Sequence, residues 1–147
     1  MSAAVFQHEV PIAFGDVDYA RVLYYPRLFH YCHLVMERFY VEVVGVPYPT
    51  LIEERRLGFP TVHLEADYRR TMDYRLVRLR FAMTVARLGT SSVELRFRVF
   101  GPDDEAPRAE ARVTTVCVDM DRFASVTLPP DLREVYSRYL ERGPTPD

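Results

Sequence analysis

The sequence predicts an α+β fold in which a five-stranded antiparallel sheet packs around one long helix. A strand-like N-terminal segment is followed by one long stretch of helical periodicity. The period then changes to strict alternation over the second half of the chain. The last three alternating segments are linked by short turns, which favours an antiparallel meander with the helix covering one of its faces.

The first half contains a strand, a loop and the main helix. Val5–Phe14 is rich in residues that favour strands, and the loop after it ends at Pro26, a residue suited to the first position of a helix. Apolar side chains then recur every three or four residues as far as Val43. This spacing predicts an amphipathic helix of about five turns, which Gly45 can end.

The remaining elements are shorter. Thr50 is expected to cap a second helix that runs to Arg56. Alternation predicts strands over residues 61–69, 77–86, 93–99 and 108–120. Val113–Val118 alternates only weakly, so we expect burial on both of its faces. We interpret residues 1–147 as one domain, with a core over residues 5–123 and a terminal helix over residues 130–141.

Composition excludes several classes of function. The net charge of −2 gives no electrostatic case for a nucleic acid or a membrane surface as partner. All 19 basic residues are arginine, so lysine Schiff-base chemistry is excluded. The sequence shows no signal peptide and no apolar run long enough to span a membrane, and we therefore expect a cytoplasmic protein. Cys32 and Cys117 lie in apolar runs and are expected to be buried free thiols.

The loop before the main helix carries a family signature. Residues 14–26 read FGDVDYARVLYYP and resemble the signature of the hotdog-fold thioesterases, most closely the 4-hydroxybenzoyl-CoA thioesterase and YbgC-like branch. Segments 59–68 and 87–92 resemble that family's second strand and the turn between its third and fourth strands. The resemblance covers residues 8–120 and implies the hotdog fold, in which a five-stranded antiparallel sheet wraps around a central helix.

Two positions depart from the family pattern. Arg21 stands where the family usually has glycine, and Arg27 stands where it usually has asparagine. If the family glycine needs a positive φ, then Arg21 implies a changed loop path. Arg27 lies near the helix start and is a candidate for contact with the substrate.

The same loop holds the candidate catalytic groups. The first N–H groups of a helix lack partners within the helix and carry the positive end of its dipole. The resemblance implies that the Tyr25 N–H donates to the thioester oxygen, a role that Pro26 cannot share because it has no N–H. It also implies that Asp18 either activates water or attacks the carbonyl directly, and the sequence leaves both open. Asp16 is expected to hydrogen-bond loop backbone.

Further residues are candidates for binding the substrate, beside Arg27. Arg69 and Arg70 could clamp the phosphates of coenzyme A, or belong to a solvated surface or a subunit contact. Tyr24 could contact the acyl group or pack in the core. His63 could lie near the acyl pocket or be an ordinary packed histidine.

These observations together predict an acyl-CoA thioesterase that needs no metal and no cofactor, since coenzyme A is part of the substrate. His30 and His33 could form half of a metal site, but no third ligand accompanies them at a suitable spacing. The alternatives are a non-catalytic acyl-CoA-binding hotdog protein and a hotdog hydratase or dehydratase.

The nature of the substrate is left open by the sequence. The acyl group could be aromatic or short to medium aliphatic, and the thiol carrier could be coenzyme A or an acyl-carrier protein. The resemblance implies homodimers, often paired again into homotetramers, with each active site between subunits. Joining two sheets edge to edge would also cover their exposed edges.

Overall fold

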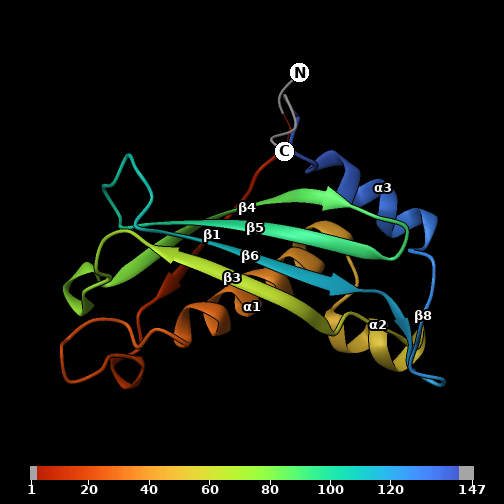
Figure 1. The fold of residues 1–147 in the computed structure, drawn as a ribbon, viewed down its shortest axis with the longest axis horizontal. Helices are drawn as coiled ribbons and strands as arrows, with labels where there is room; N and C mark the ends of the chain where they lie inside the picture. The colour runs from red at the N-terminus through yellow and green to blue at the C-terminus, as the bar shows by residue number, and fades with distance from the viewer. Residues whose placement is uncertain (1–2, 143–147) are drawn as a thin grey trace.

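The computed structural model describes residues 3–142, which form a five-stranded antiparallel sheet with one long helix against it (Figure 1). The strands run in the order β1-β4-β5-β6-β3 across the sheet. Their bounds are β1 Phe6–Pro11, β3 Thr61–Tyr68, β4 Arg78–Leu88, β5 Ser92–Phe100 and β6 Ala109–Val116. Each neighbouring pair is antiparallel, which confirms the predicted fold class and the meander of β4, β5 and β6.

The main helix, α1, spans Arg27–Phe39 and continues as a π-helical segment, η2, over Tyr40–Val44. Gly45 follows with φ of +82°, and its left-handed conformation ends the helix as expected. One face of α1 is buried against the sheet: Leu28, Tyr31, Cys32, Val35, Met36 and Phe39. Each such large apolar side chain contributes roughly 1.5–3 kcal/mol when fully buried, so packing holds the helix on the sheet.

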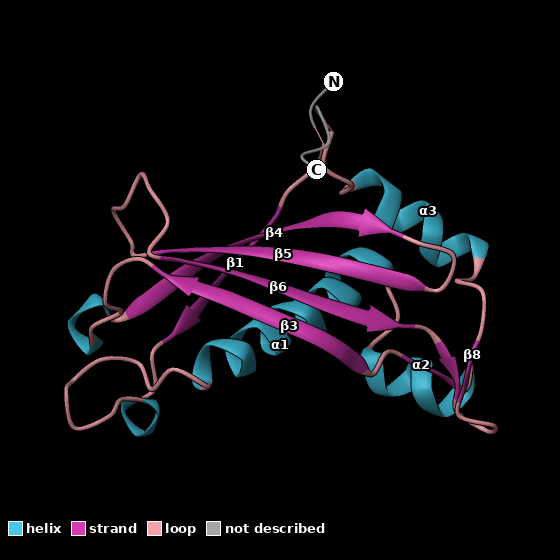
Figure 2. Cartoon of the chain, in the orientation of Figure 1, coloured by secondary structure: helices cyan, strands magenta, loops and turns pink. Residues whose placement is uncertain are grey.

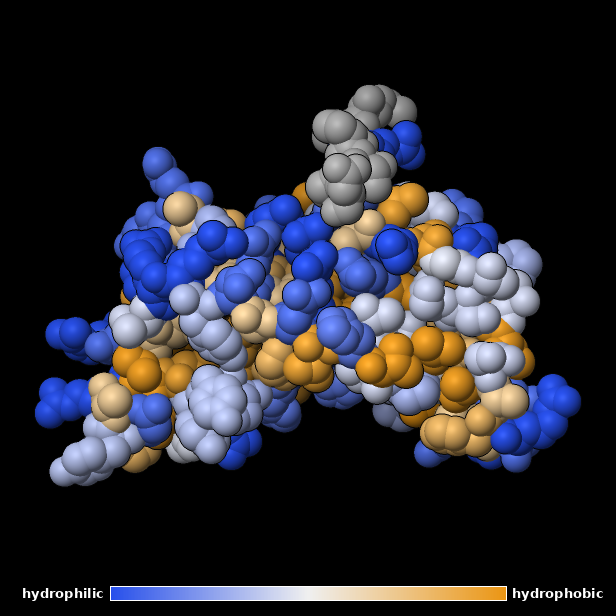
Figure 3. Space-filling view, viewed as in Figure 1, coloured by the Kyte–Doolittle hydropathy of each residue, from blue (hydrophilic) through white to orange (hydrophobic). Residues whose placement is uncertain are grey.

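The two faces of the sheet differ in character. In β5, buried Leu95 and Phe97 alternate with half-buried Arg96 and Arg98, so the apolar side chains face α1. The opposite face carries a network of ion pairs, in which Glu110 contacts three arginines. Figure 3 shows hydrophilic residues gathered over the upper part of this view and hydrophobic residues in its lower half, where β3 and α1 lie in Figure 1.

The strand expected over residues 108–120 is broken in the structure. β6 ends at Val116, and after Cys117 the chain enters a separate three-stranded sheet. In that sheet β7, Val118–Asp119, pairs with β2, Leu57–Gly58, and with β8, Ala124–Ser125. The sequence did not reveal β2 or β8. The expected burial on both faces is also wrong, because Thr115 is buried while Thr114 is only half-buried.

The two shorter helices begin and end differently from the prediction. α2 spans Tyr48–Glu54, so Thr50 lies inside it and Pro47 occupies the cap position. α3 spans Pro130–Arg138 and lies beside the end of β4 (Figure 2). The chain after α3 returns to the sheet, where the Glu141 N–H donates to the Val85 carbonyl at 2.8 Å.

Both cysteines are free and buried, as predicted. Within residues 3–142, no helix combines the length and the apolar character needed to cross a membrane.

Candidate functional site

The loop between β1 and α1 turns back on itself around Asp18. The Asp18 N–H donates to the Val22 carbonyl at 2.9 Å, and the Arg21 N–H donates to the Asp18 carbonyl at 2.9 Å. The Asp18 carboxylate accepts from the Ala20 N–H through Oδ1 at 2.8 Å, the geometry of an Asx turn. The second oxygen, Oδ2, accepts no hydrogen bond from the described part of the chain, and Asp18 is exposed. One carboxylate oxygen therefore shapes the turn and the other is available for chemistry.

Arg21 adopts the conformation that a glycine would take at this position. Its φ is +71°, in the left-handed region that side chains rarely occupy. The prediction of a changed loop path assumed that arginine would not adopt the positive φ of a glycine. That assumption is wrong, because Arg21 has this positive φ. Two hydrogen bonds hold this conformation. The Arg21 N–H donates to the Asp18 carbonyl, and the Arg21 carbonyl accepts from the Tyr74 N–H at 3.3 Å.

Asp16 anchors the loop to the helix. Its Oδ2 accepts from the Tyr31 hydroxyl at 2.7 Å, and its Oδ1 lies 3.3 Å from Nε of Arg27. The Tyr31 hydroxyl in turn accepts the Ala13 N–H at 3.0 Å. Burial, with a further contribution from Asp16, raises the pKa of Tyr31 to about 12, so this hydroxyl keeps its proton at neutral pH. Asp16 has the expected structural role, although its carboxylate binds side chains. Its backbone makes the bonds to the loop: the Asp16 N–H donates to the Ala13 carbonyl, and the Asp16 carbonyl accepts from the Tyr24 N–H.

Tyr25 lies two residues before Arg27, the first residue of α1, and hydrogen bonds hold its carbonyl. Its carbonyl accepts from the Tyr68 hydroxyl at 2.5 Å and from the Leu28 N–H at 3.4 Å. Its own N–H donates to no acceptor within residues 3–142. The Tyr25 ring is exposed and packs edge-on against the ring of Tyr24, with centroids 5.4 Å apart. A free amide at a helix start is the arrangement that an oxyanion donor requires.

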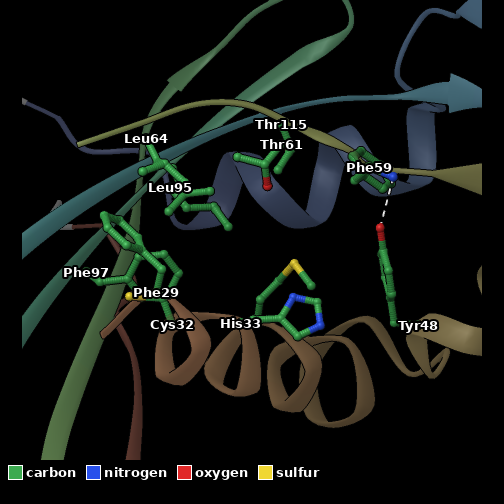
Figure 4. A pocket seen from close by; sticks show the side chains of 12 residues that line it. Phe29, Cys32, His33, Tyr48, Phe59, Thr61, Leu64, Leu95, Phe97 and Thr115 are labelled. Carbon is green, nitrogen blue, oxygen red and sulfur yellow. Dashed lines mark hydrogen bonds between the residues drawn. The ribbon is translucent and has the colours of Figure 1, made fainter. Parts of the chain in front are cut away.

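A cavity of about 140 Å³ lies between α1 and the sheet (Figure 4). The helix contributes Phe29, Cys32, His33 and Met36. The segment around α2 contributes Tyr48 and Phe59, and the strands contribute Thr61, Leu64, Leu95, Phe97, Val113 and Thr115. Phe29 lies in the first turn of α1, which begins at Arg27, so one end of the cavity lies at the start of this helix.

Most of the predicted substrate-binding residues lie elsewhere. His63 is exposed beside Glu65, whose carboxylate contacts Arg112 on the charged face of the sheet, and His63 does not line the cavity. Arg69 contacts Glu110 at 2.9 Å, and Arg70 contacts Asp104 at 3.3 Å. Arg27 is paired with Asp16 and Tyr24 is half exposed beside Tyr25. The structure thus brings Tyr24, Tyr25 and Arg27 together near the loop and leaves His63, Arg69 and Arg70 outside this group.

Sequence reasoning missed Tyr31, Tyr68 and the cavity-lining residues of α1. Tyr31 and Cys32 fall on the apolar face of the helix, where they are indistinguishable from ordinary core residues. Tyr68 is the last residue of β3. Its relation to the site is visible only in the tertiary structure, where its hydroxyl donates to the Tyr25 carbonyl. Within the described residues, no group of three or more His, Cys, Asp or Glu side chains is arranged to hold a metal ion.

The fold is that of the thioester hydrolases. A family model described as the thioesterase-like superfamily matches residues 12–135, and the chain belongs to that family. The chain is 27% identical over 132 residues to a 1,4-dihydroxy-2-naphthoyl-CoA hydrolase of Synechococcus elongatus, covering 89% of this chain and 94% of the relative. The finer assignment to the 4-hydroxybenzoyl-CoA thioesterase and YbgC-like branch stays a prediction.

Solved structures resemble the whole fold. A thioesterase superfamily protein from Jannaschia sp. CCS1 superposes with a TM-score of 0.84 at 25% identity, over 96% of this chain and 95% of that one. A 1,4-dihydroxy-2-naphthoyl-CoA thioesterase from Synechocystis, Slr0204, gives a TM-score of 0.81 at 18% identity, over 91% and 96% of the two chains. The predicted hotdog architecture is thereby confirmed.

Proposed function

We propose that this chain hydrolyses acyl-CoA thioesters to the free acid and coenzyme A, with Asp18 and the Tyr25 amide as its reacting groups. The observation that carries the proposal is the free N–H of Tyr25 at the start of α1, close to a loop whose Asp18 keeps one unbound carboxylate oxygen. Membership of the thioesterase-like superfamily supports this reaction. The name of the Synechococcus relative, a hydrolase of an aromatic acyl-CoA, supports coenzyme A as the thiol carrier.

The reaction needs charge stabilisation at one atom and a nucleophile at another. As the carbonyl carbon becomes tetrahedral, its oxygen takes negative charge, and the Tyr25 N–H donates to it. One such donor is worth about 3 kcal/mol in the transition state. In the general-base route, Asp18 takes a proton from water, the water oxygen bonds to the carbonyl carbon, and the C–S bond breaks to release the thiolate. In the nucleophilic route, an Asp18 oxygen bonds to the carbonyl carbon and the C–S bond breaks to release the thiolate. Water then cleaves the resulting anhydride to the free acid and the Asp18 carboxylate.

A second copy of the chain is expected at the edge strand β3. Among the described strands, β3 pairs with β6 alone, and nearly all of its residues are exposed. Val62 is 61% exposed, and Leu64 and Tyr68 are exposed as well. An open edge with apolar side chains is a surface that proteins normally cover, and a partner's β3 would cover it. Homodimers or homotetramers built on this edge would place the partner close to the cavity and Tyr25.

Thiol release from purified protein tests the proposed reaction. Acyl-CoA substrates with aromatic and aliphatic acyl groups are incubated with wild-type protein and with Asp18→Asn, and free thiol is followed with a thiol-reactive dye. We expect turnover by the wild type and a loss of about 100-fold or more in Asp18→Asn, the usual range for a general base. Asp103→Asn is the matched control, because Asp103 is exposed in a remote turn and should keep full activity.

Other outcomes would separate the competing functions. Full activity in Asp18→Asn would refute the assigned role of this carboxylate. Tight binding of acyl-CoA without thiol release would point to a binding protein. Loss of conjugated absorbance from an enoyl thioester, again without thiol release, would point to a hydratase.

A further inference from the structure

Three loops meet at one end of the molecule, where the segment before α1 lies beside the β3–β4 and β5–β6 connections (Figure 1). The β3–β4 connection spans residues 69–77 and contains a short helix, η3, over Tyr74–Leu76. The β5–β6 connection spans residues 101–108. Hydrogen bonds between these loops lead step by step from a partly buried arginine, Arg108, to the turn that carries Asp18.

The turn around Asp18 is paired with the β3–β4 connection. The Leu23 N–H donates to the Met72 carbonyl at 2.8 Å, and the Tyr74 N–H donates to the Arg21 carbonyl at 3.3 Å. The residue pair between these two contacts forms an antiparallel bridge. Both Leu23 and Met72 belong to the hydrophobic core, so the pairing is anchored by buried side chains.

This pairing reaches the backbone of Asp18 through one further hydrogen bond. Val22 lies in the middle of the paired segment, and its carbonyl accepts the Asp18 N–H at 2.9 Å. The Arg21 N–H donates to the Asp18 carbonyl at 2.9 Å. Residues 21–23 therefore lie between Asp18 and residues 72–74, and a displacement of residues 72–74 would move Asp18 as well.

Arg108 fixes the beginning of the β3–β4 connection. Its carbonyl accepts the N–H groups of Arg69 and Arg70 at 2.8 and 3.0 Å. Its guanidinium donates through Nη1 to the Thr71 carbonyl at 2.8 Å, one residue before the carbonyl that Leu23 binds. A single residue thus binds three consecutive residues of this connection.

The Arg108 guanidinium is itself held by Asp104. Nε donates to Oδ2 of Asp104 at 2.5 Å, and Nη2 donates to Oδ1 at 3.2 Å. Oδ2 also accepts the Gly101 N–H at 2.6 Å. The two charged side chains are only 17% and 13% exposed. All three guanidinium nitrogens are therefore engaged in one planar fork, and the single ammonium of a lysine cannot reproduce it.

We propose that Arg108 is a positioning residue for Asp18, an inference that rests on the proposed function. Arg108 fixes residues 71–74, and these residues fix the turn that carries the carboxylate. A carboxylate that takes a proton from water or attacks a carbonyl carbon depends on its placement, and a misplacement of about 1 Å can cost on the order of 100-fold in rate. Loosening Arg108 should therefore lower kcat.

Arg108→Lys and Arg80→Lys form the first comparison. Arg80 binds the same β5–β6 connection, donating to the Gly101 and Asp104 carbonyls at 3.2 and 2.7 Å, but its side chain makes no hydrogen bond to residues 69–77 of the described chain. Both substitutions loosen the β5–β6 connection, and only Arg108→Lys also breaks the fork that reaches residues 69–77. We expect kcat for thiol release to fall about tenfold or more in Arg108→Lys, with KM within about twofold of the wild type, and to change less than about twofold in Arg80→Lys.

Tyr74→Pro tests the same path without altering a charged group. Proline has no N–H, so this variant removes the hydrogen bond to the Arg21 carbonyl. Tyr74 is the first residue of η3, a position that accepts proline, and Asp73 before it has the extended backbone that proline requires of its predecessor. Tyr74→Ala is the matched control, because it removes the ring and keeps the N–H. We expect kcat to fall severalfold in Tyr74→Pro and to change little in Tyr74→Ala.

Combining Arg108→Lys with Tyr74→Pro separates a shared path from two unrelated disturbances. If both substitutions act through the turn around Asp18, the second adds little once the first has loosened that turn. The loss of kcat in the double variant should then stay within about twofold of the larger single loss. Losses that multiply would contradict the shared path.

Amide hydrogen exchange, followed by NMR, gives a readout that does not depend on turnover. The Leu23 N–H should exchange about tenfold faster in Arg108→Lys than in the wild type, and at nearly the wild-type rate in Arg80→Lys. The acceleration at Leu23 should exceed that of the Phe97 N–H in the middle of β5, which reports the stability of the whole sheet.

Three results would overturn the proposal: wild-type kcat in Arg108→Lys, unchanged exchange at Leu23 in that variant, or equal losses of kcat in Arg108→Lys and Arg80→Lys. The last result would assign the effect to a loosened β5–β6 connection alone. Absence of thiol release by the wild type would contradict only the proposed function, because the exchange rates still test whether Arg108 holds the turn.

Discussion

The Tyr31 hydroxyl joins the start of the loop between β1 and α1 to the central helix, donating to Asp16 at 2.7 Å and accepting the Ala13 N–H at 3.0 Å. Asp16 stands two residues before Asp18, so a contact on α1 fixes the segment that carries the proposed catalytic carboxylate. A buried side chain thus helps to set the position of this segment.

Replacing Tyr31 with Phe should weaken both stability and catalysis. The substitution leaves the Asp16 carboxylate and the Ala13 N–H without their partner, which costs roughly 1–3 kcal/mol of unfolding free energy. We also expect kcat to fall more than KM rises, since the loop loses its anchor while the cavity is unchanged. Urea denaturation and thiol-release kinetics measure the two effects. Tyr19→Phe, at a fully exposed ring, is the control, and equal behaviour of the two variants would contradict the anchoring role.

The hydroxyl of Tyr68 should matter through the peptide that it holds. It donates to the Tyr25 carbonyl at 2.5 Å, and this peptide lies next to the proposed oxyanion donor. Tyr68→Phe should lower kcat several-fold, because a less fixed amide stabilises the oxyanion less well, and should leave KM almost unchanged. Steady-state kinetics checks this prediction. A rise in KM alone would assign Tyr68 to substrate binding.

The backbone at Val77 is strained, and relieving it should stabilise the fold. The sequence pattern placed Val77 in a strand, but β4 begins at Arg78 and Val77 is exposed with φ of +70° and ψ of −45°. A β-branched residue rarely adopts a positive φ, and such a conformation costs about 1–3 kcal/mol. Val77→Gly should raise the unfolding free energy by roughly 1 kcal/mol after the entropy of the glycine is counted. Val62→Gly, within strand β3, should instead destabilise the protein.

Acid should loosen the hairpin between β5 and β6. The hydrogen bond from Arg108, together with the Gly101 N–H, lowers the pKa of Asp104 from 3.8 to about 2. Because the folded-state pKa is depressed, the stabilisation is fully present above about pH 4 and is lost as the pH falls from there toward 2. Asp104→Asn should flatten the stability profile in this window, as followed by thermal melts at a series of pH values. An unchanged acid profile would contradict the assignment.

The edge strand offers a test of self-association. Val62→Glu places a charge in the exposed apolar surface of β3 and should shift a dimer toward monomer in light-scattering measurements. Thiol-release activity should fall with it if the partner completes the site. Val41→Glu, at an exposed position on η2, is expected to leave the mass unchanged. A monomeric wild type would remove the basis for a shared site.

Periodicity in the sequence predicts a helix or strand well when the buried residues of that element recur at one constant spacing. Helix α1 and strand β5 keep one face in the core along their length, and β4 alternates in the same way as far as Met83, so their patterns are readable. The break at Cys117 is different, because the chain leaves the main sheet there to pair with β2, far away in sequence. No local pattern reports a change of partner strand.

A similar argument explains the position of His63. The register of β3 against β6 shifts between Thr61 and His63, so the strand contains an irregularity at Val62. Beyond that shift, alternation places Leu64 on the same side as Thr61, and His63 points to the charged face. Simple alternation would have put Thr61 and His63 together, and that is why a histidine near the pocket was a reasonable prediction from the sequence.

The loop signature predicted a turn around Asp18 followed by the start of the helix, since both depend on neighbours in the chain. It did not reveal the contact of Asp16 with Tyr31 on α1. The cavity depends on contacts between α1 and strands more than 25 residues away. The residues that line the cavity are of the same types as the residues of the core. Only the packing of the folded chain shows which of them border an unfilled volume.

Arg21 extends the range of variation open to this loop. Its left-handed backbone shows that the turn does not require glycine, so natural relatives and directed-evolution libraries can vary the side chain here while the turn itself persists. An exchange of arginine for asparagine, aspartate or histidine would then change the local electrostatic potential three residues from Asp18. We therefore expect substitutions at this position to alter the proposed catalysis while the turn keeps its shape.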